Sequence, residues 1–374
     1  MRDKNHLQVE KPLPAYQQIE NHIRAQIADG SLPVGSRLPT SDALARSMGT
    51  SVFTIQRALG RLCQDGLLDR KSKVGTFVRD TRKSLTTAGI YLGHDFQSDE
   101  HASYQRLLYR LVIERLVQRD IKMQHWTDFR PPWEQTDLPP VMKQAVNRGE
   151  VQAVFVFKGG DSPIKQWASQ VTLPAVYPTG NGGAVKACVH PDMAQMLQAG
   201  LQSLKEQGCR TVGLISTLET PYPNAASSDM RVGFYRRFID TLKELGMETR
   251  NEWMRVAQKY EPQHMQFGYQ QAQSLSSLSE LPDGLFVFSD TAAMGVVTAL
   301  LARGIAVPSR MKLALHVNEG ITYPCPFAVT QMVNRVGIIA DNLIEMIEKQ
   351  LRGEPFDTVH IPYEIRHNPG DFSV

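Results

Sequence analysis

Apolar positions near the start of the chain recur every three or four residues, a spacing that predicts amphipathic helices. Tyr16, Ile19, Ile23 and Ile27 form the first such stripe. The stripe begins just after a proline and stops at a glycine, residues that favour the first turn and the end of a helix, respectively. Residues 14–30 are therefore expected to form a helix that supports the rest of the domain.

Two further short helices and a hairpin are predicted downstream. Thr40 or Ser41 can cap a second helix, which stops at Gly49. A third helix is expected from Ser51 to an Asp-Gly pair at 65–66, and two short strands follow in residues 67–78. This α+β arrangement in residues 12–79 is that of a winged helix-turn-helix, whose second motif helix enters the DNA major groove. The inward-facing positions of the third helix are Ile55, Leu59 and Leu62.

The solvent side of the third helix carries side chains of the types that contact DNA. Arginine pairs with guanine or phosphate, glutamine with adenine, threonine with either, and phenylalanine contacts a thymine methyl group. Lysines in the hairpin are suited to phosphates or a minor groove. A small helical domain with a solvated, mildly basic face is the alternative interpretation. The residues concerned are Phe53, Thr54, Gln56, Arg57 and Arg61 in the helix, and Lys71, Lys73 and Gly75 in the hairpin.

From residue 88 onward, short apolar runs alternate with amphipathic stretches. The polar, non-periodic residues 80–87 are expected to form a linker. Strand–helix alternation of this length predicts parallel sheets covered on both faces. The candidate strands are residues 88–92, 121–125, 151–157, 175–177, 211–215, 253–257, 284–288 and 312–316. The candidate helices include residues 104–118, 192–206, 234–245, 265–278 and 292–303.

The number of these units exceeds one doubly wound sheet, so residues 88–374 are expected to form an α/β domain of two similar lobes. A ligand of a parallel sheet binds beyond the carboxyl ends of its strands, which places the candidate site in the cleft between the lobes. Polar or aromatic residues follow several of the strands. They are Asp95, Phe96, Asp161, Ser289 and Asp290, with Arg231 after a long loop at 217–229.

Charge is distributed unevenly along the chain. Residues 1–80 carry 12 Lys and Arg against 8 Asp and Glu, whereas the other 294 residues have a net charge of −1. A local positive charge attracts phosphates and makes the affinity depend on salt. The distribution therefore agrees with a nucleic-acid partner for the first domain and a different kind of partner for the rest.

The sequence gives no indication of an enzyme, a metal or a cofactor. The four cysteines lack C-x-x-C spacing, so buried free thiols are expected, and the ten histidines lack metal-ligand spacing. No P-loop, G-x-S-x-G or H-E-x-x-H motif is present. There is also no apolar run of membrane-spanning length and no secretory signal, so a cytoplasmic protein is expected.

The segment from Pro14 to Val78 resembles the GntR-type winged helix at the N-terminus of bacterial transcription regulators. Its most specific motifs are GSRLPT, ALA, S-x-x-T-I-x-x-AL, L-x-x-x-GLL and GTFV. The resemblance implies DNA contacts around the second helix, in the recognition helix and in the wing. The implied residues are Arg37, Thr40, Ser41, Arg46, Ser51, Thr54, Arg57 and Gly75.

Three departures from the family pattern affect DNA recognition. Val52 and Gln56 stand where many members have arginine, and Thr40-Ser41-Asp42 replaces the usual S-E-R after Leu-Pro. We therefore expect a different or weaker operator. One winged helix should bind weakly, so useful affinity requires two copies.

Residues 88–366 resemble the effector domain of the lactose and galactose repressor family, which has the two-lobed, type I periplasmic-binding-protein-like fold. The pieces that carry the resemblance are VHPDMAQMLQAGLQSLKEQGCRTVGLIS, RVGFYRRFIDTLKELGM, DGLFVFSDTAAMGVVTALLARGIAVP and VTQMVNRVGIIADNLIEMIEKQLRGEP. The resemblance implies that Asp290 and Arg231 face the cleft, where each can bind adjacent hydroxyl groups or a carboxylate in a bidentate manner. Packing roles are the alternative.

Three aromatic residues are further candidates for the effector site. Phe96, Tyr104 and Tyr222 can stack on a pyranose, although core or lobe-surface packing is the favoured interpretation for any single one of them. Asn318 lies in a segment where the family often has a glycine-aromatic-aspartate stretch. The usual acidic contact is therefore absent or replaced.

These observations predict a ligand-responsive bacterial transcription regulator, more specifically a repressor. A homodimer would bind a palindromic operator, and a sugar or a similar small polar metabolite would bind in the cleft and change the freedom of the two winged helices. Two alternatives remain open: the lobed domain is only a dimerisation scaffold, or the chain is a soluble small-molecule-binding protein or enzyme without a role at DNA.

Overall fold

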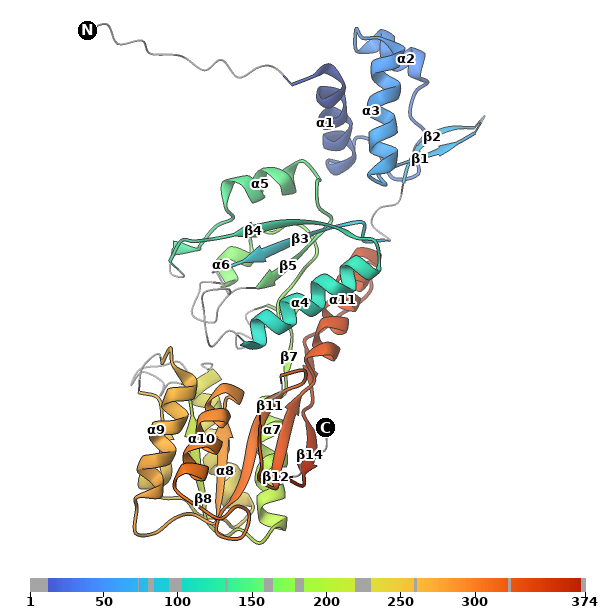
Figure 1. Cartoon of the computed structure of the whole chain (residues 1–374). Coiled ribbons are helices and arrows are strands. Elements are labelled where there is room, and N and C mark those ends of the chain that lie inside the picture. The colour runs from blue at the N-terminus through green and yellow to red at the C-terminus, as the bar shows by residue number, and fades with distance from the viewer. Residues whose placement is uncertain are drawn as a thin grey trace, which may run out of the picture.

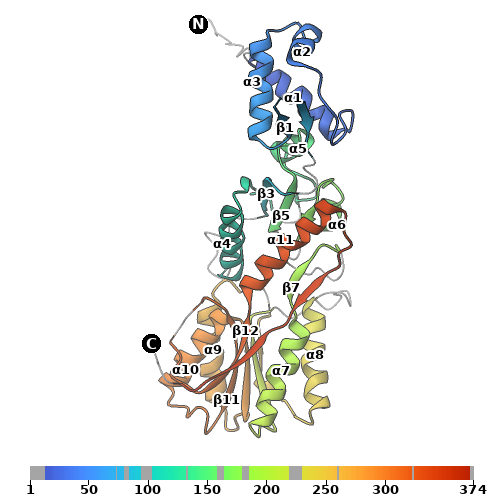
Figure 2. The same cartoon turned by 90° about the vertical axis from the view of Figure 1, so that its right-hand side faces the viewer.

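The computed structural model describes residues 13–72, 74–79, 84–93, 103–131, 134–157, 164–178, 185–218, 230–258, 261–321 and 324–370. Three bodies follow one another along the molecule: an N-terminal head, a middle N-lobe and a C-lobe at the far end (Figures 1 and 2). The predicted two-domain fold class is confirmed, with the second domain divided into the two expected lobes.

The head has the three predicted helices and the predicted hairpin. They are α1 (Ala15–Ala28), α2 (Ser41–Ser47) and α3 (Val52–Gln64), followed by antiparallel β1 (Leu68–Lys71) and β2 (Gly75–Val78). Thr40 caps α2 by accepting a hydrogen bond from the Ala43 backbone N–H, 3.2 Å away. Ile55, Leu59 and Leu62 are buried in the head core, as the spacing predicts.

The N-lobe is built on a four-stranded parallel sheet in the order β4-β3-β5-β6. Its central strand β5 is a run of five buried residues, which is typical of a parallel sheet covered on both faces. The strands are β3 (Thr87–Leu92), β4 (Lys122–Thr127), β5 (Ala153–Phe157) and β6 (Ala175–Val176), with helices α4 (Ser103–Gln118), α5 (Pro140–Asn147) and α6 (Ile164–Ala168).

The C-lobe has a six-stranded sheet in the order β14-β12-β11-β10-β8-β9, parallel except for β14. Separate apolar clusters pack around Phe238 and around Val296. Its strands are β8 (Val212–Ser216), β9 (Met254–Val256), β10 (Gly284–Phe288), β11 (Lys312–Asn318), β12 (Val329–Asn334) and β14 (Glu364–Asn368). Its helices are α7 (Met193–Glu206), α8 (Met230–Glu244), η3 (Asn251–Trp253), α9 (His264–Ser276) and α10 (Asp290–Ala302).

The chain passes between the lobes more than once, so neither lobe is a continuous segment. The strands β7 (Val189–Pro191) and β13 (Val359–Ile361) pair in parallel between the two sheets. Helix α11 (Val336–Arg352) follows β12 of the C-lobe but contributes to the N-lobe core, beside α4, where Asp341 pairs with Arg115 at 2.9 Å (Figure 2).

All eight strands predicted for the second domain are present to within about two residues. The strands β7, β12, β13 and β14 were not predicted. β7 and β13 are three residues long and β14 is a polar edge strand, so these three give no strong apolar signal, whereas β12 is six residues long and mostly buried and was missed. The expected linker is shorter at its C-terminal end, because Leu85 is buried in the N-lobe core and β3 begins at Thr87; residues 80–83 lie outside the described residues.

The head rests on the N-lobe through a small polar contact. Asp65, after the last turn of α3, pairs with Arg24 of α1 and accepts a hydrogen bond from Lys122 Nζ at the start of β4, 3.1 Å away. A groove of about 520 Å³ lies between the two bodies around this contact. The C-terminal end of α3 faces the N-lobe, so α2 and the N-terminal turn of α3 point away from it (Figure 1).

Candidate nucleic-acid interface and effector cleft

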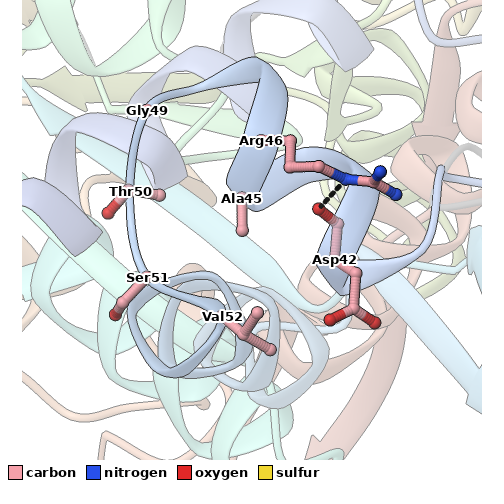
Figure 3. Close-up of a pocket in the computed structure, with 7 residues that line it drawn as sticks. All are labelled: Asp42, Ala45, Arg46, Gly49, Thr50, Ser51 and Val52. Atoms are coloured by element: carbon pink, nitrogen blue, oxygen red, sulfur yellow. Dashed lines mark hydrogen bonds between the residues drawn. The ribbon is translucent and has the colours of Figure 1, made fainter.

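The turn between α2 and α3 forms an open hollow of about 680 Å³ at the free end of the head (Figure 3). It is lined by Asp42, Ala45, Arg46, Gly49, Thr50, Ser51 and Val52. Gly49 has a φ of +61°, a conformation that L side chains rarely adopt, so the glycine permits the sharp turn between the helices. The hollow thus brings together residues that the sequence placed on both helices of the motif.

Two predicted DNA contacts, Ser51 and Thr54, are hydrogen-bonded to each other. Ser51 Oγ accepts from the Thr54 backbone N–H at 3.1 Å and lies 2.8 Å from Thr54 Oγ1. Ser51 is therefore the N-cap of α3. Among the predicted contacts of α2, Thr40 has the same capping role and Ser41 is the first helical residue.

Arg57 is exposed, as the sequence predicts, but it also makes a contact with α1 that the sequence did not indicate. Its guanidinium lies over the ring of Tyr16 on α1, 4.2 Å from the ring centroid, and Arg61 lies 5.5 Å from the same centroid. Arg61 also pairs with Glu20 at 3.3 Å. Burial raises the pKa of Glu20, and the nearby Arg61 opposes this shift. Tyr16 was predicted to support the fold because it belongs to the apolar stripe of the first helix. That pattern does not indicate a contact between its ring and an arginine.

The wing depends on a close approach between Arg37 and Gly75. The backbone of Arg37 forms an isolated antiparallel β-bridge with Phe77. A Cβ atom at Gly75 would lie only 2.6 Å from Arg37 Nε. Gly75 also has a φ of +140°. Lys71 Nζ lies 5.4 Å from the Phe77 ring centroid, and Lys73 lies outside the described residues. The glycine therefore makes room for an arginine predicted to contact DNA.

Phe53, Gln56 and Arg46 complete the exposed face of the motif. The side chain of Phe53 is 74% exposed, an unusual state for a ring of this size. Gln56 is exposed one turn later, and Arg46 Nε donates to the Asp42 carbonyl at 3.3 Å. Figure 3 shows Arg46 and Val52 on the two helices that border the hollow.

A polar contact crosses between the two lobes at the starts of two helices, α4 and α10. Ser103, at the start of α4 in the N-lobe, donates from Oγ to Asp290 Oδ2 at the start of α10 in the C-lobe, at 3.4 Å. Asp290 is only 2% exposed. Asp290 therefore lies at a contact between the lobes, and its predicted role toward a ligand stays a prediction.

Asp290 belongs to a buried chain of hydrogen bonds that the sequence did not reveal. Its Oδ2 also accepts from Asn318 Nδ2 at 2.8 Å, and Asn318 Oδ1 accepts from Asn334 Nδ2 at 2.8 Å. Asp290 Oδ1 accepts from the Thr291 backbone N–H at 2.8 Å. The carboxylate thus holds its own helix terminus as well as the lobe contact, so the structure gives it the packing role left open by the sequence.

Neighbouring polar groups surround this chain. Ser289 Oγ lies 3.2 Å from His264 Nδ1 and 3.3 Å from Thr217 Oγ1. The hydroxyl of Tyr104 is buried without a hydrogen-bond partner among the described residues, and burial raises its pKa. Such an unpaired buried hydroxyl is costly and can donate to a ligand in the cleft.

His316 is buried in the C-lobe, between two aromatic rings. Its ring centroid is 4.7 Å from that of Phe288 and 5.6 Å from that of Tyr363, and Tyr363 Oη is 3.3 Å from His316 Nε2. Burial lowers the pKa of His316 to about 4, although Asp290 opposes the shift. Asn334 is the last residue of β12, and Tyr363 lies between β13 and β14. The sequence did not predict these three strands.

Several predicted effector residues cannot be placed. Asp95, Phe96, Asp161 and Tyr222 lie outside the described residues. The backbone of Arg231 belongs to α8, but its side chain is outside the described part of the structure. Their roles in the cleft therefore stay predictions.

The described residues show no group of three or more His, Cys, Asp or Glu side chains that could hold a metal ion. Cys63, Cys188, Cys209 and Cys325 are all free, and the last three are buried, in agreement with the expected thiols. None of the helices in the described ranges combines the length and the apolar content needed to cross a membrane.

Two family models match the chain. Residues 15–78 match the bacterial regulatory proteins of the gntR family, and residues 201–366 match the periplasmic binding protein-like domain. Among solved structures, a LacI family transcription regulator from Clostridium acetobutylicum covers 75% of this chain with a TM-score of 0.58 and 16% identity; 98% of that structure is matched. At this identity the likeness shows the fold alone.

Relatives found by sequence match different lengths of the chain. The chain is 29% identical over 146 residues to the HTH-type transcriptional repressor PurR of Actinobacillus pleuropneumoniae serotype 5b (strain L20), a match that spans 38% of this chain and 40% of that repressor. It is 30% identical over 349 residues to the HTH-type transcriptional regulator GalR of Streptococcus thermophilus, which covers 82% of this chain and 91% of the relative. The chain therefore belongs to the bacterial transcription regulators related to GalR, with a GntR-family DNA-binding head and a periplasmic binding protein-like effector domain.

Proposed function

We propose that this chain is a cytoplasmic repressor that binds a palindromic operator as a homodimer and responds to a small polar metabolite, most simply a sugar. The observation that carries the proposal is the position of the helix-turn-helix hollow and the wing at the free end of a head that rests on a two-lobed domain (Figure 1). One head presents one recognition helix, so a palindrome requires two copies.

The groups placed at the cleft suit hydroxyl groups of a ligand. The carboxylate of Asp290, the amide of Asn318 and the hydroxyls of Ser289 and Tyr104 can accept from or donate to a polyol, and none of them carries a positive charge. A ligand that takes the place of Ser103 on Asp290 would break the contact between lobes. Its differential affinity for the open and closed arrangements then shifts the population of the head positions.

Operator binding is tested with the full-length protein and a random-sequence duplex pool. We expect enrichment of an inverted repeat, with an affinity that falls steeply between 50 and 200 mM salt, as phosphate contacts require. Arg46→Ala should weaken binding, whereas Arg303→Ala, an exposed arginine at the end of α10, should leave it unchanged. Failure to enrich any sequence, with no salt dependence, contradicts the proposal.

Effector binding is tested by thermal shift against a panel of monosaccharides, disaccharides and acidic metabolites. A compound that raises the melting temperature should also change operator affinity, measured by fluorescence anisotropy. Tyr104→Phe should reduce the thermal shift, because it removes the buried unpaired hydroxyl while it keeps the ring. Binding of acidic metabolites alone would contradict a sugar effector.

A second candidate function is that of a DNA-binding protein whose lobed domain only dimerises. The observation that favours it is the hydrogen-bond chain from Ser103 through Asp290 and Asn318 to Asn334, in which protein groups bind the Asp290 carboxylate. In that case the dimer and its operator affinity should persist while no compound in the panel raises the melting temperature.

A further inference from the structure

The first turns of the recognition helix carry one arginine, Arg57, which is exposed. Its guanidinium lies over Tyr16 of α1, together with that of Arg61. Arg46 of α2 is also exposed, and its Nε donates to a backbone carbonyl of its own helix. Readout of guanine in the major groove most often uses a bidentate Arg or Lys, and the contact with Tyr16 competes with that use of Arg57.

The side chains that remain at the tip are mostly apolar. Ser51 and Thr54 bond to each other, which leaves Val52, Phe53 and Gln56 on the first turns of α3. Val52 lines the hollow beside Ala45, and Phe53 is 74% exposed. The carboxylate of Asp42 also borders the hollow and disfavours the acceptor edge of guanine.

An apolar group in the major groove has one apolar partner there, the 5-methyl group of thymine. We propose that Phe53 is a specificity-determining residue that contacts this methyl group, so that an A·T pair is selected at the base step it faces. Val52 extends the same apolar surface toward the hollow. The inference rests on the proposed function as an operator-binding protein, and it names the chemistry by which the recognition helix distinguishes bases.

The experiment removes only the methyl group. A duplex selected from a random pool by the full-length protein is synthesised with each thymine replaced in turn by deoxyuridine, and the affinities are measured by anisotropy. We expect at least one position where the replacement weakens wild-type binding about fourfold, the effect of one buried methyl group. In Phe53→Ala the same replacement should have no effect, whereas Phe53→Leu should retain part of it.

Phe129→Ala is the matched control, because Phe129 is a similarly exposed phenylalanine, 80% accessible, that follows β4 in the N-lobe. It should keep the wild-type response at every position. A selected operator without a methyl-sensitive thymine, or a Phe53→Ala protein that is as methyl-sensitive as wild type, overturns the inference and leaves operator binding intact. If no sequence is selected at all, the proposed function fails and the inference fails with it.

Discussion

At the residue scale, His316 is the clearest case of a side chain whose chemistry is set by its surroundings. The imidazole is enclosed by the rings of Phe288 and Tyr363 in the C-lobe, with Asp290 nearby. Burial lowers its pKa from 6.5 to about 4, which keeps the ring neutral under physiological conditions. Its Nδ1 has no hydrogen-bond partner among the described residues.

This shift predicts that acid weakens the folded protein. The unfolded chain binds a proton near pH 6.5 and the folded protein only near pH 4, so the stability that His316 contributes is complete above pH 6.5 and is lost as the pH falls toward 4. The free energy of unfolding of wild type should therefore decrease by about 2 kcal/mol more than that of His316→Gln between pH 7 and pH 5. Urea titration at several pH values measures the difference.

The control for this prediction is His367→Gln, a change at an exposed histidine in β14. It should retain the wild-type pH dependence. Parallel pH profiles for wild type and His316→Gln would show that the buried imidazole does not control the acid response.

At the element scale, two glycines let α9 and α10 cross with their backbones in contact. A Cβ atom at Gly268 would lie 2.2 Å from the Ala292 carbonyl oxygen, and one at Gly295 would lie 2.0 Å from the Met265 carbonyl oxygen. Because backbone atoms occupy both positions, neither helix can make room without moving. Ser289, Asp290 and His264 lie at the starts of these two helices, so the crossing also fixes part of the cleft.

Gly295→Ala should therefore destabilise the C-lobe by about 3 kcal/mol through overpacking. Gly233→Ala in α8 is the matched control, because nothing lies within 4 Å of the Cβ position there. That change should stabilise the protein slightly, by about 0.5–1 kcal/mol, since alanine is the better helix former. Denaturant unfolding of both variants distinguishes the effects, and equal stabilities would contradict the close crossing.

At the scale of the whole molecule, the head and the N-lobe meet through a small charged contact. Lys122 of β4 reaches Asp65 of the head at 3.1 Å, and Asp65 also pairs with Arg24 inside the head. Lys122 is largely exposed, so solvent screens the pair and limits its energy. A weak contact of this kind can orient the head without holding it rigidly. The proposed function requires such freedom, because the ligand is proposed to shift the position of the head.

A double-mutant cycle tests this contact. Lys122→Ala should lower the free energy of unfolding by about 0.2–1 kcal/mol in wild type and by nothing in an Asp65→Asn background, which lacks the charge. The coupling should decrease at 1 M salt. A cost for Lys122→Ala that is equal in both backgrounds would mean that the two bodies are not linked through this pair.

Much of the head followed from the sequence because its determinants are local. Apolar spacing defined α1 and α3, Thr40 or Ser41 was expected to cap α2, and α3 was expected to start near Ser51. The structure shows that Thr40 and Ser51 are the caps. The side chains that sequence patterns could not orient are those fixed by a neighbouring element. Arg57 had a solvent-facing position on its own helix, and only the packing of α1 against α3 placed it over Tyr16.

The sequence by itself determined the winged helix and the alternation of strands and helices, whereas the role of Asp290 in a cleft stays a prediction. The tertiary structure decided which groups meet around that residue. Ser103 and Asp290 are 187 residues apart, and Asn334 reaches Asn318 only because an unpredicted strand, β12, lies beside β11. The reason is physical: local periodicity fixes which face of an element is buried, whereas partners across a cleft depend on how the lobes fold back on each other.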